Sequence, residues 1–157
     1  MSSDLTMLRT LLQQAEGERD EAAAQLRQAQ ARAQAAEQQA EQLRAYRGQY
    51  HDRWSQQFAR GGAIEIVQCY QSFNQRLEQA VQMQQTAADQ QQAALERLRT
   101  LVAQREMRVA SVRKLIERRE QDLRRVQTRQ EQKATDEAAQ RAAWGGPLAS
   151  RLMNQFG

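Results

Sequence analysis

Apolar and small residues recur at alternating spacings of three and four along two long stretches of the chain, residues 5–54 and 67–126. This spacing is typical of helices that bury a narrow stripe of side chains against another helix. Gly61 and Gly62 separate the two stretches, and adjacent glycines favour a tight reversal of the chain. The pattern therefore predicts an all-α fold, a long two-helix antiparallel coiled-coil hairpin with a longer second helix.

The same pattern sets the expected boundaries within the chain. We expect a first helix over about residues 5–58, a turn over about 59–63 and a second helix over about 64–143. Residues 1–144 then form a single coiled-coil hairpin. We expect residues 145–157 to be a flexible C-terminal tail, in which Leu148, Leu152 and Phe156 have helical spacing.

A reversal at Gly61 and Gly62 also predicts which residues face each other. Position i of the first helix should lie opposite about position 123 − i of the second. This register places Tyr50 opposite Phe73, and Leu26 opposite Leu95 and Leu98. The second helix then outlasts the first, so residues 119–143 are expected to extend without an intramolecular partner.

The composition agrees with long helices rather than a thick globular core. The 157 residues are 27% charged and only 5% aromatic, with a net charge of +4. A single cysteine, Cys69, excludes an intramolecular disulfide. No apolar run approaches the roughly 20 residues that a membrane-spanning helix needs, and the N-terminus lacks a secretory pattern. These features predict a soluble cytoplasmic protein.

The sequence offers little for catalysis. His51 is the one histidine, and neither it nor Cys69 belongs to a cluster with the spacing of metal ligands. A nucleophilic pair of Cys69 and His51 across the turn is conceivable, but isolated pairs of this kind seldom carry chemistry. No glycine-rich phosphate loop is present. We therefore expect no enzyme, no cofactor and no metal site.

Most of the aromatic residues flank the Gly61-Gly62 reversal. Tyr50, Trp54 and Tyr70 lie on the heptad stripe and are expected to pack between the helices. Tyr46 and Phe73 lie one step off that stripe. Because a two-helix pair cannot bury so many large rings, these two side chains are expected to remain accessible to a protein partner.

The late part of the second helix is basic. From residue 97 to residue 133, arginine and lysine outnumber the acidic residues. Pairs such as Glu120 and Arg124 explain part of this bias as a solvated helix face. The excess indicates an acidic partner, either a protein groove or a nucleic-acid backbone. Interspersed acids and the absence of a recognised DNA-reading module weigh against nucleic acid.

Four short segments resemble the FliJ family of flagellar type III export proteins. They are LRAYRGQY at residues 43–50, YQSFNQRLEQA at 70–80, ERRE at 117–120 and EQKATDE at 131–137. The injectisome counterparts, the YscO-like proteins, share this architecture and are the nearest alternative. The pairing of Tyr-x-x-x-Tyr with Phe-x-x-x-Leu favours the flagellar branch.

The resemblance implies a function that the residues alone do not name. FliJ proteins are non-enzymatic components of the bacterial flagellar export apparatus, similar to the antiparallel coiled coil of the rotary ATP synthase gamma subunit. The resemblance implies a stalk that inserts into the export ATPase ring and promotes its assembly and activity. It also implies a link to the export gate protein FlhA, association with export chaperones, and a location at the cytoplasmic face of the inner membrane at the flagellar base.

The resemblance further implies two sets of binding residues and a mostly monomeric state. The gate-binding set is Tyr46, Tyr50, Phe73, Leu77 and Ala80. The ATPase-binding set, expected at the open end, is Leu5, Leu8, Arg9, Leu12, Arg118 and Arg125. No nucleic-acid partner is expected on this interpretation. Two alternatives remain, a nucleic-acid-associated coiled coil that uses the arginine-rich second helix and a dimeric scaffold built from two chains.

Overall fold

The computed structural model describes the backbone of residues 2–155 and the side chains of residues 3–145. It contains helix α1 (Ser2–Ala59) and helix α2 (Ile64–Gln155), packed against each other, and no strand occurs among these residues. The all-α class, the antiparallel pair and the longer second helix are therefore confirmed. The observed break between the helices falls at the predicted turn.

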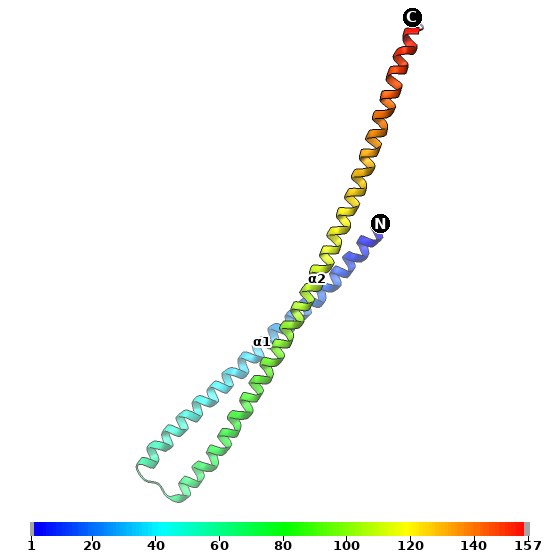
Figure 1. Cartoon of the computed structure of the whole chain (residues 1–157). Helices are drawn as coiled ribbons and strands as arrows, with labels where there is room; N and C mark the ends of the chain where they lie inside the picture. The colour runs from blue at the N-terminus through cyan, green and yellow to red at the C-terminus, as the bar shows by residue number, and fades with distance from the viewer. Residues whose placement is uncertain (1, 156–157) are drawn as a thin grey trace. The chain divides into compact units, whose positions relative to one another are not determined.

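The chain divides into two compact units, which are described separately. One unit comprises residues 14–109, and the other comprises the residues up to Gln13 with those from Ala110 onward. In the 14–109 unit, α1 and α2 run side by side in opposite directions and join at the short turn (Figure 1). The rings of Tyr50 and Phe73 lie 4.6 Å apart between centroids. Tyr50 therefore lies opposite Phe73, as the predicted register places it.

The core of the 14–109 unit is a thin seam of small and aliphatic side chains between the helices. Its buried residues are Ala15, Ala22, Ala29, Ala33, Ala40, Leu77, Val81, Ala88, Leu95 and Val109. Leu95 packs against Ala29 and Ala33, with Leu26 and Leu98 beside them. Alanine lets the two backbones approach closely but buries little apolar area, at about 25 cal/mol per Å². The few larger side chains, Leu95 above all, therefore carry much of the burial.

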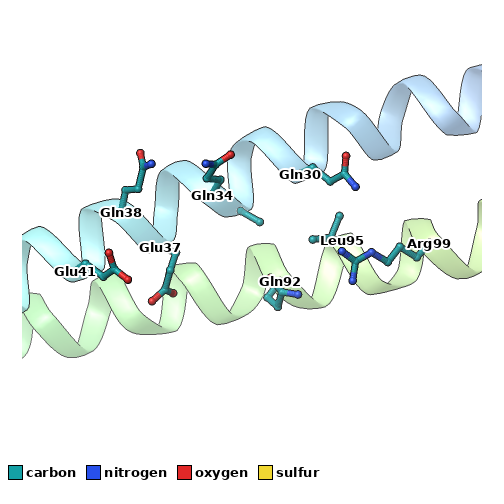
Figure 2. Close-up of a pocket in the computed structure, with 9 residues that line it drawn as sticks. Gln30, Gln34, Glu37, Gln38, Glu41, Gln92, Leu95 and Arg99 are labelled. Atoms are coloured by element: carbon teal, nitrogen blue, oxygen red, sulfur yellow. The ribbon is translucent and has the colours of Figure 1, made fainter.

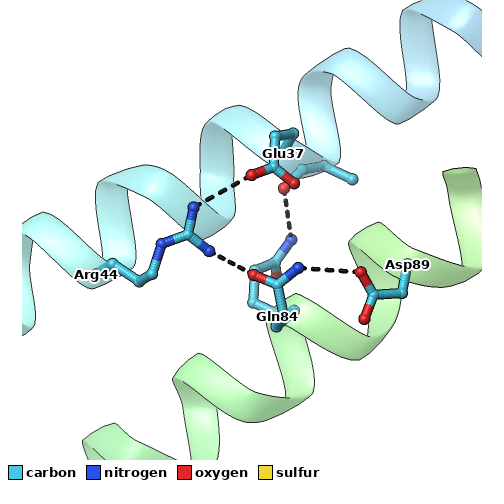
Figure 3. Close-up of polar contacts among 6 residues, drawn as sticks. Glu37, Arg44, Gln84 and Asp89 are labelled. Carbon is cyan, nitrogen blue, oxygen red and sulfur yellow. Dashed lines mark hydrogen bonds and ion pairs between the residues drawn. The ribbon is translucent and has the colours of Figure 1, made fainter.

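Polar contacts bridge the middle of this seam (Figure 3). The Arg44 guanidinium donates to Oε1 of Glu37 at 3.1 Å and to Oε1 of Gln85 on the facing helix. Gln85 in turn donates to the Asp89 carboxylate at 3.0 Å. Gln84 donates to a backbone carbonyl of α1 at 3.4 Å. Since a shift in register would break these contacts, they favour one alignment of the two helices over its neighbours.

A second polar cluster lies nearer the other end of the same unit. The Glu18 carboxylate accepts hydrogen bonds from Arg105 at 2.9 Å and from Arg108 at 3.1 Å. The predicted register would bring Arg19 close to Arg105, but Arg19 instead pairs with Asp20 at 3.0 Å. Acidic residues of α1 thus pair with both arginines and offset the repulsion between their like charges.

The turn between the helices depends on one glycine. Gly61 has a φ of 87°, in the left-handed region that glycine adopts without a steric penalty. The Arg60 and Gly61 backbone N–H groups donate to the carbonyls of Gln57 and Phe58 at 3.2 and 3.1 Å. These bonds satisfy carbonyls at the end of α1 that have no partner inside the helix. Gly61 therefore closes α1 and turns the chain toward α2.

In the other unit, the first residues of α1 pack against α2 from Ala110 onward. The Arg119 guanidinium donates to the Asp4 carboxylate at 2.5 Å, and Arg9 lies 3.6 Å from the Glu120 carboxylate. From Arg124 to Gly145 every residue is exposed. The predicted unpaired extension of 119–143 is therefore wrong at its start, since α1 reaches as far as Arg119 and Glu120.

Helix α2 continues to Gln155, beyond the end at about residue 143 that the sequence predicts. The expected tail begins at Gly145, Gly146 and Pro147, but a proline removes only one backbone donor and the residues after it favour helix. The predicted tail over 145–157 is therefore helical as far as Gln155. Residues 156–157, which complete that tail, lie outside the described residues.

Candidate partner-binding surfaces

An aromatic cluster occupies the turn end of the 14–109 unit. Its members are Tyr46, Tyr50, Trp54, Phe58, Tyr70 and Phe73. Tyr50 lies at its centre, with ring centroids 5.6 Å from Tyr70 and 4.6 Å from Phe73 across the helix pair. On its own helix, Tyr50 contacts Tyr46 at 6.3 Å and Trp54 at 6.0 Å. The cluster thus joins both helices.

The helix pair leaves every ring of this cluster partly accessible. Tyr46 and Phe73 are 46% and 39% exposed, whereas Tyr50, Trp54 and Tyr70 are half-buried between the helices. The predicted difference between these two groups of rings is confirmed. Desolvation raises the pKa of Tyr50 above its ordinary value of 10.0, because burial between the helices disfavours the charged phenolate. Tyr46 and Phe73 are therefore the rings of the cluster most accessible to a partner.

The predicted gate-binding set lies on and beside this cluster. Tyr46, Tyr50 and Phe73 contribute accessible ring surface, and Ala80 is half-buried further along α2. Leu77 differs, because it is 5% exposed and belongs to the seam. Leu77 therefore offers a partner little contact area of its own.

The pairing of Cys69 with His51 does not form. Nδ1 of His51 lies 2.6 Å from the Tyr70 hydroxyl, which occupies this ring nitrogen in a hydrogen bond. Cys69 is exposed on α2. No group of three potential metal ligands occurs within the part of the chain that the structure describes. His51 therefore serves to fix the orientation of Tyr70 within the aromatic cluster.

The predicted ATPase-binding set lies in the other unit and has two kinds of member. Leu5, Leu8 and Leu12 are half-buried, so much of their apolar surface is already covered. Arg9, Arg118 and Arg125 are exposed, and Arg9 faces Glu120. The surface offered to a partner here therefore combines these arginines with exposed apolar side chains such as Leu11 and Leu115.

A family model described as the flagellar FliJ protein matches residues 5–147, nearly the whole chain. The chain belongs to the FliJ family. No curated protein and no solved structure gives a significant match. Membership of the FliJ family makes this protein a component of flagellar export. Among the described residues, neither helix contains a stretch apolar enough to cross a bilayer.

A hollow in the middle of the FliJ-family hairpin unit is polar (Figure 2). Glutamine and glutamate side chains surround it, with Arg99 at one end and the buried Leu95 beneath. Arg99 is already paired with Glu96 at 2.7 Å. The hollow holds no histidine or cysteine, and its amides resemble any solvated coiled-coil flank. We assign it no chemistry.

Sequence reasoning missed a second hollow beside the aromatic cluster. This groove of about 440 Å³ is lined by Tyr50, Trp54, Cys69, Ser72, Phe73 and Arg76. Residues 69, 72, 73 and 76 share one face of α2 through their three- and four-residue spacing. That spacing was visible in the sequence. The rings that α1 contributes to the floor depend on the register between the helices.

Proposed function

We propose that this FliJ-family protein is a non-enzymatic stalk of the flagellar export apparatus that connects the export ATPase ring to the export gate. The observation that carries the proposal is the aromatic cluster beside the turn, where rings from both helices remain accessible. A thin helix pair with accessible rings is suited to contact another protein. Family membership supports a place in flagellar export.

On this proposal the aromatic cluster faces the cytoplasmic part of the export gate protein FlhA. Tyr46 and Phe73 supply the exposed rings, and Tyr50 fixes both, because it stacks with Tyr46 and packs at a tilt against Phe73. Aromatic side chains are frequent hot spots because they bury large areas with few rotatable bonds. On the same proposal, Leu77 acts beneath these rings from its place in the seam, and Ala80 acts beside them on α2.

The basic segment of the other unit faces the export ATPase ring. Arg118 and Arg125 are exposed on α2, and all residues from Arg124 to Gly145 remain uncovered by α1. An acidic groove of the ring would attract these arginines over long range and orient the stalk as it enters. Leu5, Leu8 and Leu12 hold α1 against α2 at this end. Export chaperones are further partners on the same proposal.

The proposal places the protein at the cytoplasmic face of the membrane, held there by its partners, and mostly as a monomer. The seam between α1 and α2 already buries the heptad stripe within one chain over residues 15–109. A second chain is therefore not needed to cover it. Sedimentation equilibrium of the purified protein would give the mass of one chain, whereas a dimeric scaffold would give twice that mass.

Addition of the protein to the purified export ATPase is expected to raise ATP hydrolysis and to increase the fraction of ring-shaped assemblies. Both effects should saturate at a fixed stoichiometry, because a central stalk has one position in each ring. Arg118→Glu with Arg125→Glu reverses the charge at two exposed positions of the ATPase-binding set, and this double variant should need at least tenfold higher concentration for the same activation. Absence of stimulation at any ratio would refute the stalk.

A nucleic-acid partner is the second candidate, favoured by the exposed arginines of late α2. Glu131, Asp136 and Glu137 are interspersed among these bases, and they would repel a phosphate backbone. A titration of duplex DNA at low salt separates the two functions. The stalk proposal expects no binding there, while binding that falls steeply as salt rises would support the nucleic-acid function.

A further inference from the structure

The groove beside the aromatic cluster combines an apolar floor with a cationic rim. Tyr50, Trp54 and Phe73 supply rings, and the exposed Cys69, Ser72 and Arg76 complete the lining. Its volume of about 440 Å³ lies within the usual range of pockets that receive a ligand or a partner's side chains. The groove is open along α2, so a peptide segment can enter it from the side.

Arg76 is the feature that distinguishes this groove from an ordinary apolar hollow. Its guanidinium makes no ion pair or hydrogen bond within the described residues. Glu78, the nearest acid along α2, is occupied by Arg47 at 3.1 Å. The helix positions three and four residues away from Arg76 carry no acid either. The rim therefore presents a free cation with five N–H donors toward the partner.

The part of the chain around the groove is positively charged, as Arg76 is. Between residues 44 and 80 the chain has five arginines and three acidic residues, so the turn end of the hairpin unit carries a net positive charge. A guanidinium binds a carboxylate through two parallel hydrogen bonds, a geometry that an unpaired arginine at a groove rim offers directly. Apolar rings beneath it exclude water from one side, which strengthens such a pair.

We propose that this groove receives an acidic segment of the export gate's cytoplasmic part, with an apolar side chain on the three rings and a neighbouring carboxylate on Arg76. This inference rests on the proposed gate-binding function and specifies its chemistry. Tyr46 and Phe73 give contact area, whereas the groove and Arg76 select which partner segment binds. Ser72, at the exposed wall, leaves space for the peptide backbone.

Charge reversal at Arg76 tests this inference with the purified cytoplasmic domain of the export gate as the probe. Arg76→Glu should weaken binding at least about tenfold at low salt, because a like charge then faces the partner's carboxylate. Arg76→Lys should bind within about threefold of the unchanged protein. Arg97→Glu is the matched control, an exposed arginine on the same helix outside the groove, and should change the Kd less than twofold.

A second variant tests the apolar part of the groove without removing a packed side chain. Ser72→Trp places a large ring over the groove from an exposed position and should abolish binding while the circular dichroism spectrum stays unchanged. If the unchanged protein binds and Arg76→Glu and Ser72→Trp bind equally well, the groove inference is wrong and the gate-binding function stands. If the unchanged protein fails to bind, both are wrong.

Discussion

Replacement of Tyr50 and Phe73 together by alanine is expected to weaken binding to the export gate's cytoplasmic domain by at least about a hundredfold. Tyr50 contacts Phe73 at 4.6 Å and Tyr70 at 5.6 Å, so its loss removes the support of the neighbouring rings as well as its own surface. Isothermal titration or surface plasmon resonance would measure the Kd directly.

The same double variant should keep nearly all of its helix content. The buried seam from Ala15 to Ala40 on α1 and from Val81 to Val109 on α2 does not depend on these two rings. Met83→Ala is the matched control, because Met83 is 74% exposed on α2 yet lies away from the cluster, and it should leave the Kd unchanged. A marked loss of helicity in the double variant would mean that the rings act as core rather than as a binding surface.

Replacement of Leu95 by alanine should lower the free energy of unfolding by about 2–3 kcal/mol. Leu95 is 5% exposed and packs against Ala29 and Ala33, which are too small to fill the space that its side chain would leave. Urea unfolding followed by circular dichroism would show a lower midpoint with an unchanged slope. The effect should be large for this protein because so few large side chains are buried in its seam.

A comparison with an exposed residue makes this stability test specific. Met83→Ala on the same helix should change the free energy of unfolding by less than about 0.5 kcal/mol. Helix propensity differs little between methionine and alanine, so the comparison isolates the burial of Leu95. Equal effects of the two substitutions would show that the seam contributes little and that the polar bridges hold the helices together instead.

The heptad spacing was sufficient to predict the helix pair and its register. One reversal at Gly61 and Gly62 fixes the partner of each position along both stretches, and the packing of Leu26 and Leu98 with Leu95 follows from that single fact. A seam of small residues was equally visible, since alanine recurs on the stripe of α1. Helix pairing is predictable here because it depends on residue spacing alone.

The choice of polar partners was not predictable in the same way. Glu18 binds both Arg105 and Arg108, and Arg47 binds Glu78. The two helices carry several other acidic residues with which these arginines could have paired. Long side chains reach residues a full turn away, so their final partners depend on rotamers and on competition between neighbours. The sequence shows that no acid lies three or four residues from Arg76, but the pairing of Glu78 with Arg47 across the helices, which also leaves Arg76 unpaired, depends on that competition.

The end of α2 shows a different limit. Two glycines and a proline at 145–147 are strong signals for a break, yet α2 continues through them to Gln155. Glycine and proline destabilise the helix locally, whereas the helical residues on both sides of them can compensate for one missing backbone hydrogen bond. Local signals of this kind locate a weak point in a long helix rather than its end.

The central claim is that this FliJ-family protein links the export ATPase to the export gate, and a co-sedimentation measurement tests it most directly. The ATPase rings would be sedimented with the gate's cytoplasmic domain, with and without the protein. We predict that the gate domain sediments with the rings only when the protein is present, and that Tyr50→Ala with Phe73→Ala removes the gate domain but leaves the variant on the rings. Sedimentation of the gate domain to the same extent without the protein, or exclusion of the gate domain from rings that carry it, would contradict the account.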